Sequence, residues 1–190
     1  MKRQAVRYQK AMVENITLLL PYLALVSHIV FIILLLSLIF RNFWGREIAR
    51  WLGRHAVALA FMVALAAIIG SLFYSEIVGF EPCVLCWWQR VFLYPTVFIF
   101  AAALWRKDRS VFSYVLPLIV LGGIIAVYQA QVNFGGSSFL ACTDGEGACS
   151  KIYVMAFGYI TIPMMSLTVS LYILLLAWAN KIYGKNYSHS

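Results

Sequence analysis

Long apolar segments restrict this chain to one class of fold. No charged residue occurs from Ile16 to Phe40, and about 20 apolar residues are enough for a helix to span a membrane. Only 12% of the residues are charged, and 63% are hydrophobic; soluble domains have about 25% charged residues. Four further apolar segments follow: His55 to about Phe80, Leu85 to about Trp105, Val111 to about Val132 and Ile152 to about Asn180. The sequence therefore predicts an all-α, polytopic membrane protein with five transmembrane helices.

The first apolar segment has a signal peptide as its alternative interpretation. It is too long for the hydrophobic region of a signal peptide, and no small-x-small cleavage site follows it. We therefore interpret residues 16–40 as a transmembrane helix. We interpret His28, which lies within it, as a packed or hydrogen-bonded residue rather than a ligand.

Residues 41–54 have opposed faces when they are drawn as a helix. One face carries apolar side chains and the opposite one carries arginines. The members are Trp44, Ile48, Trp51 and Leu52 on the first face, and Arg46, Arg50 and Arg54 on the second. This pattern predicts an amphipathic helix lying in the membrane interface with its arginines toward anionic headgroups. A polar connecting loop is the alternative.

The distribution of basic residues predicts the orientation. The net charge is +8, which by itself would also fit a nucleic-acid-binding protein. The basic residues stand in short runs between apolar segments, so we expect no nucleic acid partner. Segments 41–54 and 106–109 and the tail after Asn180 share one side, which is therefore predicted to be cytoplasmic. The basic residues of segment 1–15 disagree with this rule, because a spanning first helix places them outside.

The third apolar segment begins with a Cys-x-x-Cys pair, in the sequence Glu81-Pro82-Cys83-Val84-Leu85-Cys86-Trp87-Trp88-Gln89-Arg90. Pro82 suits the first turn of a helix. Both sulfurs are then expected at the helix N-terminus, where free N–H groups and the helix dipole favour a thiolate and lower the cysteine pKa. Glu81 opposes this effect as a nearby like charge.

Several chemically useful side chains share one stripe of this helix. At 100° per residue they are Cys83, Cys86, Trp87, Arg90 and Tyr94. A dithiol, a permanent cation and aromatic rings on one face at the membrane surface predict redox chemistry beside a lipid-soluble partner. Glu76, near the end of the second apolar segment, is a candidate for proton handling; simple snorkelling toward the interface is the alternative.

A second cysteine pair, Cys142 and Cys149, lies in a segment rich in glycine and serine. Gly145 and Gly147 let the chain bend so that the two sulfurs can meet. All four cysteines are predicted to be extracytoplasmic, where disulfides form and persist.

Three kinds of site fit four such cysteines: structural disulfides, a four-cysteine zinc site, and a thiol–disulfide relay. A Cys-x-x-Cys bridge closes a very short loop and is a poor staple. The second spacing is long for a zinc knuckle and no histidine is nearby, so we predict no metal. The relay is the interpretation that we favour.

The motif around Cys83, together with Ser75-Glu76 before it and Tyr94-Pro95 after it, resembles the DsbB family of disulfide-forming membrane oxidoreductases. The resemblance is closest to the BdbC branch, whose closely spaced second pair is similar to Cys142 and Cys149. It covers about residues 55–180. We therefore divide the chain into an N-terminal extension, residues 1–54, and a four-helix catalytic domain, residues 55–190.

The resemblance implies a function and the role of each cysteine. Members of this family reoxidise an extracytoplasmic thioredoxin-fold thiol oxidase (DsbA- or BdbD-like) and pass two electrons to a membrane quinone, menaquinone or ubiquinone. Cys142 would form the mixed disulfide with the partner, and Cys149 would exchange with Cys83. Cys86 would face the quinone, Arg90 would hold a quinone oxygen, and Trp87 and Tyr94 would contribute to the quinone site. The redox disulfides would be Cys83–Cys86 and Cys142–Cys149.

The same resemblance implies a multi-pass protein of a bacterial cell membrane, with the redox cysteines outside and the C-terminus in the cytoplasm. Two alternatives remain. A vitamin K epoxide reductase-like enzyme has its loop pair before its Cys-x-x-Cys pair, which is the reverse of this chain. A membrane scaffold with structural disulfides or a metal site belongs to a different class.

The predicted topology can be tested by the accessibility of single cysteines introduced at Asn42 and Ser190. Both are expected to react only after the cytoplasmic face is opened, because both adjoin segments on the basic side. Labelling of the two positions from opposite sides of the membrane would contradict the topology.

Overall fold

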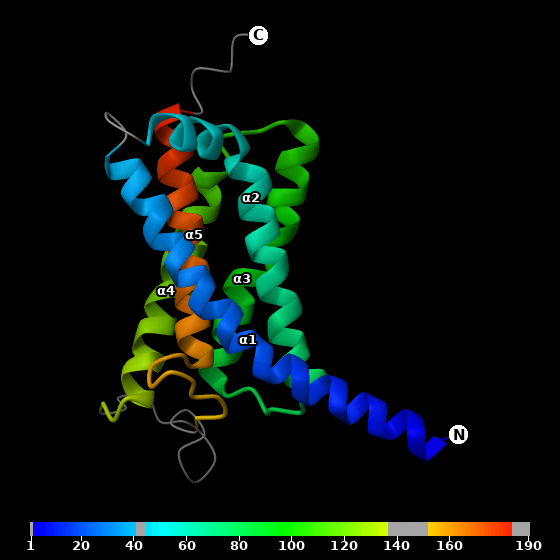
Figure 1. Cartoon of the computed structure of the whole chain (residues 1–190). Coiled ribbons are helices and arrows are strands. Elements are labelled where there is room, and N and C mark those ends of the chain that lie inside the picture. The colour runs from blue at the N-terminus through cyan, green and yellow to red at the C-terminus, as the bar shows by residue number, and fades with distance from the viewer. Residues whose placement is uncertain (1, 41–44, 137–151, 184–190) are drawn as a thin grey trace.

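The computed structural model describes residues 2–40, 45–136 and 152–183, with side chains from Ile16 onward (Figure 1). These ranges are helical apart from short connections and one isolated bridge between Ala156 and Ile160. Five of the helices are long and apolar enough to cross a membrane, which confirms the predicted all-α, polytopic class. The elements are α1 (Lys2–Ile39), α2 (Arg46–Leu72), the π-helical turn η1 (Phe73–Ile77), α3 (Val84–Arg106), α4 (Phe112–Asn133) and α5 (Ile162–Tyr183).

Helices α2 to α5 form the bundle, and α1 crosses it obliquely (Figure 1). Alanines at seven- and four-residue spacing give α2 a smooth buried face: Ala49, Ala56, Ala60 and Ala64. Small side chains let helix backbones approach closely, which supplies the dispersion contacts that hold membrane helices together. Large side chains fill the remaining space, including Phe100, Ile119 and Ile173, all at most 2% exposed.

The predicted interfacial helix is the beginning of α2, and in this respect the prediction of a separate element was wrong. Residues 46–54 continue into the second span without a break in helical structure. Figure 1 shows these first turns lying across one end of the bundle before α2 turns along it. Ile48 and Trp51 are exposed, as an interfacial helix requires, while Ala49 and Leu52 pack inward. Residues 41–44, including Trp44, lie outside the described residues.

The fifth span begins at Ile162, ten residues later than the sequence predicted. Residues 152–161 are not helical, because Phe157 (φ 53°) and Gly158 (φ 76°) adopt left-handed backbone conformations. This turn lets Ala156 and Ile160 exchange two backbone hydrogen bonds of 3.0 and 2.9 Å. Pro163 then stands in the first turn of α5, where its missing N–H costs nothing.

Helix α1 has 38 residues, and at about 1.5 Å per residue it is nearly twice as long as the ~30 Å hydrocarbon core is thick. Its N-terminal part extends beyond the bundle at the end where α3 begins (Figure 1). Hydrogen bonds attach its middle to α5: the His28 Nε2 atom lies 2.8 Å from Thr168 Oγ1, and the Tyr172 hydroxyl donates to the Ser27 carbonyl. The interpretation of His28 as a hydrogen-bonded residue is confirmed.

The opposite end of the bundle gathers basic residues from segments that are distant in sequence. The Asn180 Nδ2 atom donates to the Arg109 carbonyl over 3.0 Å, and an Arg109 guanidinium nitrogen donates to the Arg54 carbonyl. The start of α2, the connection between α3 and α4 and the end of α5 thus share one end of the bundle, away from the start of α3 (Figure 1). Their cytoplasmic placement remains a prediction.

The close approach of α2 and α5 at this end yields a stability prediction. A Cβ atom on Gly53 would lie 2.7 Å from the Tyr183 Cβ atom and 2.8 Å from the Ala179 carbonyl oxygen. Gly53→Ala is therefore expected to lower the free energy of unfolding by about 1–3 kcal/mol. The measurement is thermal unfolding in detergent, followed by circular dichroism.

Gly70→Ala is the matched control, since a Cβ atom at Gly70 meets nothing within 4 Å and alanine is the better helix former. It should unfold at the same temperature as the unaltered chain or slightly above it. Equal effects of the two substitutions would contradict the proposed close contact.

Candidate active site

Cys83 and Cys86 stand where α3 begins. Cys83 is the N-cap, with extended backbone angles (φ −71°, ψ 169°), and its carbonyl accepts a 3.0 Å hydrogen bond from the Trp87 N–H. Cys86 is the third residue of the helix. The expected location of both sulfurs at the helix N-terminus is confirmed, although Pro82 precedes the cap instead of lying in the first turn.

The two sulfur atoms lie 3.2 Å apart, so the dithiol is arranged to close into a disulfide with little movement. Cys83 is buried and Cys86 is partly buried. The hydrogen bond with Cys86, followed by burial, raises the pKa of the Cys83 thiol. For Cys83, the expected lowering by the helix terminus was wrong, because the neighbouring sulfur and the loss of water outweigh the helix dipole.

Two buried glutamines complete the surroundings of the sulfurs. The Gln129 Nε2 atom, on α4, lies 3.2 Å from Cys83 Sγ and 3.3 Å from Cys86 Sγ. The Gln89 Nε2 atom, one turn beyond Cys86 on α3, donates to Gln129 Oε1 over 2.7 Å. The dithiol therefore faces amide N–H donors.

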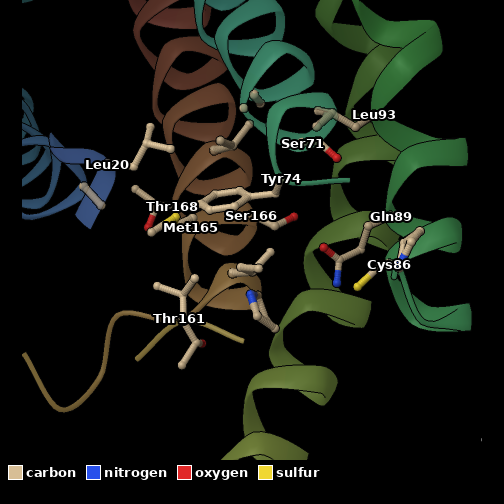
Figure 2. A pocket seen from close by; sticks show the side chains of 18 of the residues that line it. Leu20, Ser71, Tyr74, Cys86, Gln89, Leu93, Thr161, Met165, Ser166 and Thr168 are labelled. Atoms are coloured by element: carbon tan, nitrogen blue, oxygen red, sulfur yellow. The ribbon is translucent and has the colours of Figure 1, made fainter. Parts of the chain in front are cut away.

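A cavity of about 540 Å³ opens beside Cys86 and extends between α1, α2, α3 and α5. Figure 2 shows that Cys86 and Gln89 border it on one side, and that Leu20, Met165 and Thr168 border it on the other. Most of its lining is aliphatic or aromatic. Such a cavity, with a few polar groups, is the usual form of a small-molecule site.

Arg90 brings a positive charge into this cavity. Its Nε atom donates to Ser71 Oγ over 3.0 Å, and one of its terminal nitrogens donates to the Ser71 carbonyl oxygen over 3.1 Å. The guanidinium carbon lies 5.3 Å from the centre of the Trp87 ring, a cation–π contact. Within the described ranges, no carboxylate lies within ion-pair distance of Arg90.

Of the residues predicted to share the stripe, four line the cavity: Cys83, Cys86, Arg90 and Tyr94. Trp87 does not line it and is exposed on the outer side of α3. Its part in the site is the contact with the Arg90 guanidinium. Glu76 is also exposed and outside the lining; its carboxylate accepts a 3.0 Å hydrogen bond from the Ser75 hydroxyl. Ser75 lines the cavity, so Glu76 is connected to it through this hydrogen bond, and its role in proton handling remains a prediction.

Four buried polar atoms of the cavity lining have no hydrogen-bond partner among the described residues. They are Tyr74 Oη, Tyr94 Oη, Asn133 Oδ1 and Thr161 Oγ1. A buried polar atom without a partner costs about 1–3 kcal/mol. Polar atoms in such a position fit a ligand that carries oxygen atoms of its own.

The segment that follows the second cysteine pair borders the same cavity. Tyr153 stacks on Phe80 with ring centres 4.7 Å apart, and Phe80 stacks on Tyr74 at 5.8 Å. This stack joins residues 152–161 to the turn that leads into Cys83. Cys142 and Cys149 themselves lie outside the described residues, so their pairing and the four-cysteine zinc alternative are not tested. Within the described ranges, no group of three His, Cys, Asp or Glu side chains could hold a metal ion.

Comparisons with known proteins identify the family of this chain. A scan against protein families matches residues 53–180 to "Disulfide bond formation protein DsbB". The chain belongs to the DsbB family. It is therefore related to proteins that take part in disulfide bond formation, which is an oxidation of thiols. The prediction of this family is confirmed. The match begins within α2, and α1 falls outside it.

Curated relatives in Bacillus agree with the predicted BdbC branch. "Probable disulfide formation protein C 2" of Bacillus cereus is 37% identical over 67% of this chain and 92% of its own length. "SPbeta prophage-derived disulfide bond formation protein B" of Bacillus subtilis is 44% identical over 57% of this chain and 73% of its own length. "Disulfide bond formation protein C" of the same organism is 41% identical over 61% and 85%. The comparison with solved structures gave no significant match.

Sequence reasoning missed Ser71, Gln89 and Gln129. Gln129 could have been recognised from the sequence, because an amide in a transmembrane helix is costly and indicates a polar contact. Nothing in the sequence told which helix supplies the partner. Ser71 carried no signal, since a serine in a membrane helix also bonds to its own backbone.

Proposed function

We propose that this protein is a membrane thiol:quinone oxidoreductase that reoxidises an extracytoplasmic thioredoxin-fold thiol oxidase. The observation that carries the proposal is that Cys83, Cys86 and Arg90 line one apolar cavity inside a membrane bundle. Membership of a family of disulfide bond formation proteins supports the thiol chemistry. The cavity and its cation support the quinone.

The cavity fits the head group of a quinone by size and by chemistry. A volume of about 540 Å³ lies within the usual range for small-molecule sites. A quinone carries two carbonyl oxygens on a flat apolar ring. Arg90 and the hydroxyls of Tyr74, Tyr94 and Thr161 are donors for those oxygens, and aliphatic side chains contact the ring. A bound quinone, menaquinone or ubiquinone, would supply the acceptor for two electrons and two protons.

Arg90 is suited to hold an oxygen on which negative charge develops. Its guanidinium stays protonated even when it is partly desolvated. Ser71 and Trp87 fix its orientation, so little reorganisation is needed when charge appears nearby. The absence of an ion-pair partner among the described residues leaves its charge available to a ligand.

The Cys83/Cys86 pair would receive electrons from Cys142 and Cys149 by thiol–disulfide exchange. In each exchange a thiolate attacks a disulfide sulfur, one S–S bond forms as another breaks, and the leaving sulfur takes up a proton. The net result is one disulfide and one dithiol exchanged between the two pairs. The partner's dithiol would first react in the same way at Cys142.

Chain connectivity supports contact between the pairs. Cys149 precedes Ile152 by three residues, and Ile152 lines the same cavity as Cys83. Consecutive Cα atoms are 3.80 Å apart, so the Cα atoms of Cys149 and Ile152 are separated by no more than about 11 Å. The length of chain alone therefore allows Cys149 to reach the cavity that Cys83 lines.

The extracytoplasmic placement of the cysteines is part of the proposal. The basic residues gather at the opposite end of the bundle, which the positive-inside rule assigns to the cytoplasm. The C-terminus, after α5, would then be cytoplasmic. Glu76 is kept as the candidate for proton handling, because its carboxylate accepts a hydrogen bond from Ser75, which lines the cavity.

Arg90→Lys is expected to lower the turnover of quinone reduction about 100-fold, because lysine keeps the charge but loses the planar fork that both Ser71 and a quinone oxygen require. Binding of the partner protein should be unchanged. The measurement is quinol formation with a reduced thioredoxin-fold partner as donor. Arg106→Lys, at the exposed end of the same helix, is the control. Unchanged turnover and an unchanged Michaelis constant for quinone would count against this role of Arg90.

The order of the cysteine pairs is tested by a Cys142→Ser, Cys149→Ser double variant. Its Cys83/Cys86 dithiol should still be oxidised by added quinone, while oxidation of a reduced partner should be lost. Single-turnover thiol counting with and without quinone measures both. If quinone cannot oxidise the double variant, the order of the pairs is wrong. If the variant oxidises its partner normally, Cys142 and Cys149 form only a structural disulfide.

A further inference from the structure

We propose that Gln129 is a positioning residue that stabilises the reduced Cys83/Cys86 pair against its disulfide, and that Gln89 holds Gln129 in the orientation this requires. The inference rests on the proposed redox role of Cys83 and Cys86. It goes beyond that role, because it assigns the control of the reduction potential to two residues outside the Cys-x-x-Cys pair.

The contacts account for every polar atom of the Gln129 amide. Its Nε2 atom lies within 3.3 Å of both sulfurs, and its Oε1 atom accepts from Gln89 at 2.7 Å. Gln129 is 4% exposed and Gln89 is 9% exposed, so water does not compete for these bonds. The amide bridges α3 and α4 at the level of the dithiol.

Donation by an amide favours one redox state over the other. An N–H group stabilises a sulfur that carries negative charge, and charge-assisted hydrogen bonds are about twice as strong as neutral ones. A disulfide sulfur is only a weak acceptor and gains little from the same donor. Reduction adds two electrons to the pair and one proton when one of the sulfurs stays a thiolate, so donors that stabilise this reduced form raise the reduction potential of the pair. The pair becomes easier to reduce by an incoming dithiol.

Gln89 decides which end of the Gln129 amide faces the sulfurs. Rotation of Gln129 by half a turn would place Oε1 against them, where it repels a negatively charged sulfur. The Gln89 N–H group pairs only with the oxygen end of Gln129, and so holds the nitrogen end toward Cys83 and Cys86. Without Gln89 the two orientations differ less in energy, and part of the stabilisation is lost.

The test is the midpoint of reduction of Cys83/Cys86 in thiol–disulfide buffers, measured by maleimide labelling. The background is the full chain with Cys142→Ser and Cys149→Ser, so that a single pair is counted. Gln129→Leu removes both donors at similar side-chain size. At its midpoint of reduction, this variant is expected to need a ratio of dithiol to disulfide in the buffer that is about tenfold higher. For two electrons this corresponds to a reduction potential lower by about 30 mV. Gln89→Leu should shift the midpoint in the same direction by less.

The double variant Gln89→Leu, Gln129→Leu leaves no buried amide without a partner, and it should fold even if one single variant does not. Its midpoint should equal that of Gln129→Leu, because Gln89 acts only through Gln129. Gln131→Leu changes an exposed glutamine of the same helix and should leave the midpoint unchanged.

A wild-type midpoint in both variants that lack Gln129 would overturn the inference while leaving the proposed redox pair intact. Full additivity of the two single shifts would overturn the role assigned to Gln89. If the pair cannot be cycled in the unaltered background, the proposed function fails, and the inference fails with it.

Discussion

A chain inside a bilayer has no water to bond its backbone, and this constraint decides where its reactive residues can stand. Regular helices satisfy every internal N–H and C=O group, which leaves free N–H groups only at helix starts. Cys83 and Cys86 occupy such a start, on α3. Residues 152–161, which are not helical, stand at the same end and pair their own backbone through the bridge between Ala156 and Ile160. Two non-helical parts of the described chain, residues 78–83 and 152–161, thus border the cavity that the dithiol lines.

The same lack of water makes each polar side chain in the bundle costly. The contacts of such a side chain therefore indicate its role. Ser71 uses both its hydroxyl and its carbonyl to hold Arg90. Gln89 and Gln129 hold one another and face the sulfurs. These groups come from three helices and meet at one cavity. The chemistry of the site is therefore set by the packing of the bundle as much as by the Cys-x-x-Cys motif.

The sequence was sufficient for the class of fold and for the helix that carries the motif, because apolar length and helical spacing are local properties. Cys83, Cys86, Arg90 and Tyr94 were placed together from spacing along α3 alone, and all four line the cavity. Trp87 does not line the cavity, because spacing along a helix gives a face and not the neighbours of that face, but it contacts Arg90. The start of α5 was misplaced because the left-handed turn at Phe157 and Gly158 lies inside a sequence that remains apolar. Gln129 and Ser71 depend on which helices are adjacent, and that information is not local.

In the proposed function, electrons from this dithiol leave through the cavity to a quinone. Anaerobic addition of a water-soluble quinone to the fully reduced chain, with free thiols and quinol counted together, tests it most directly. One quinol should appear for every two thiols lost, and filling the cavity by Ser166→Trp should slow both changes to the same extent. Thiols that stay reduced in the presence of excess quinone, in a chain that unfolds normally, would contradict it.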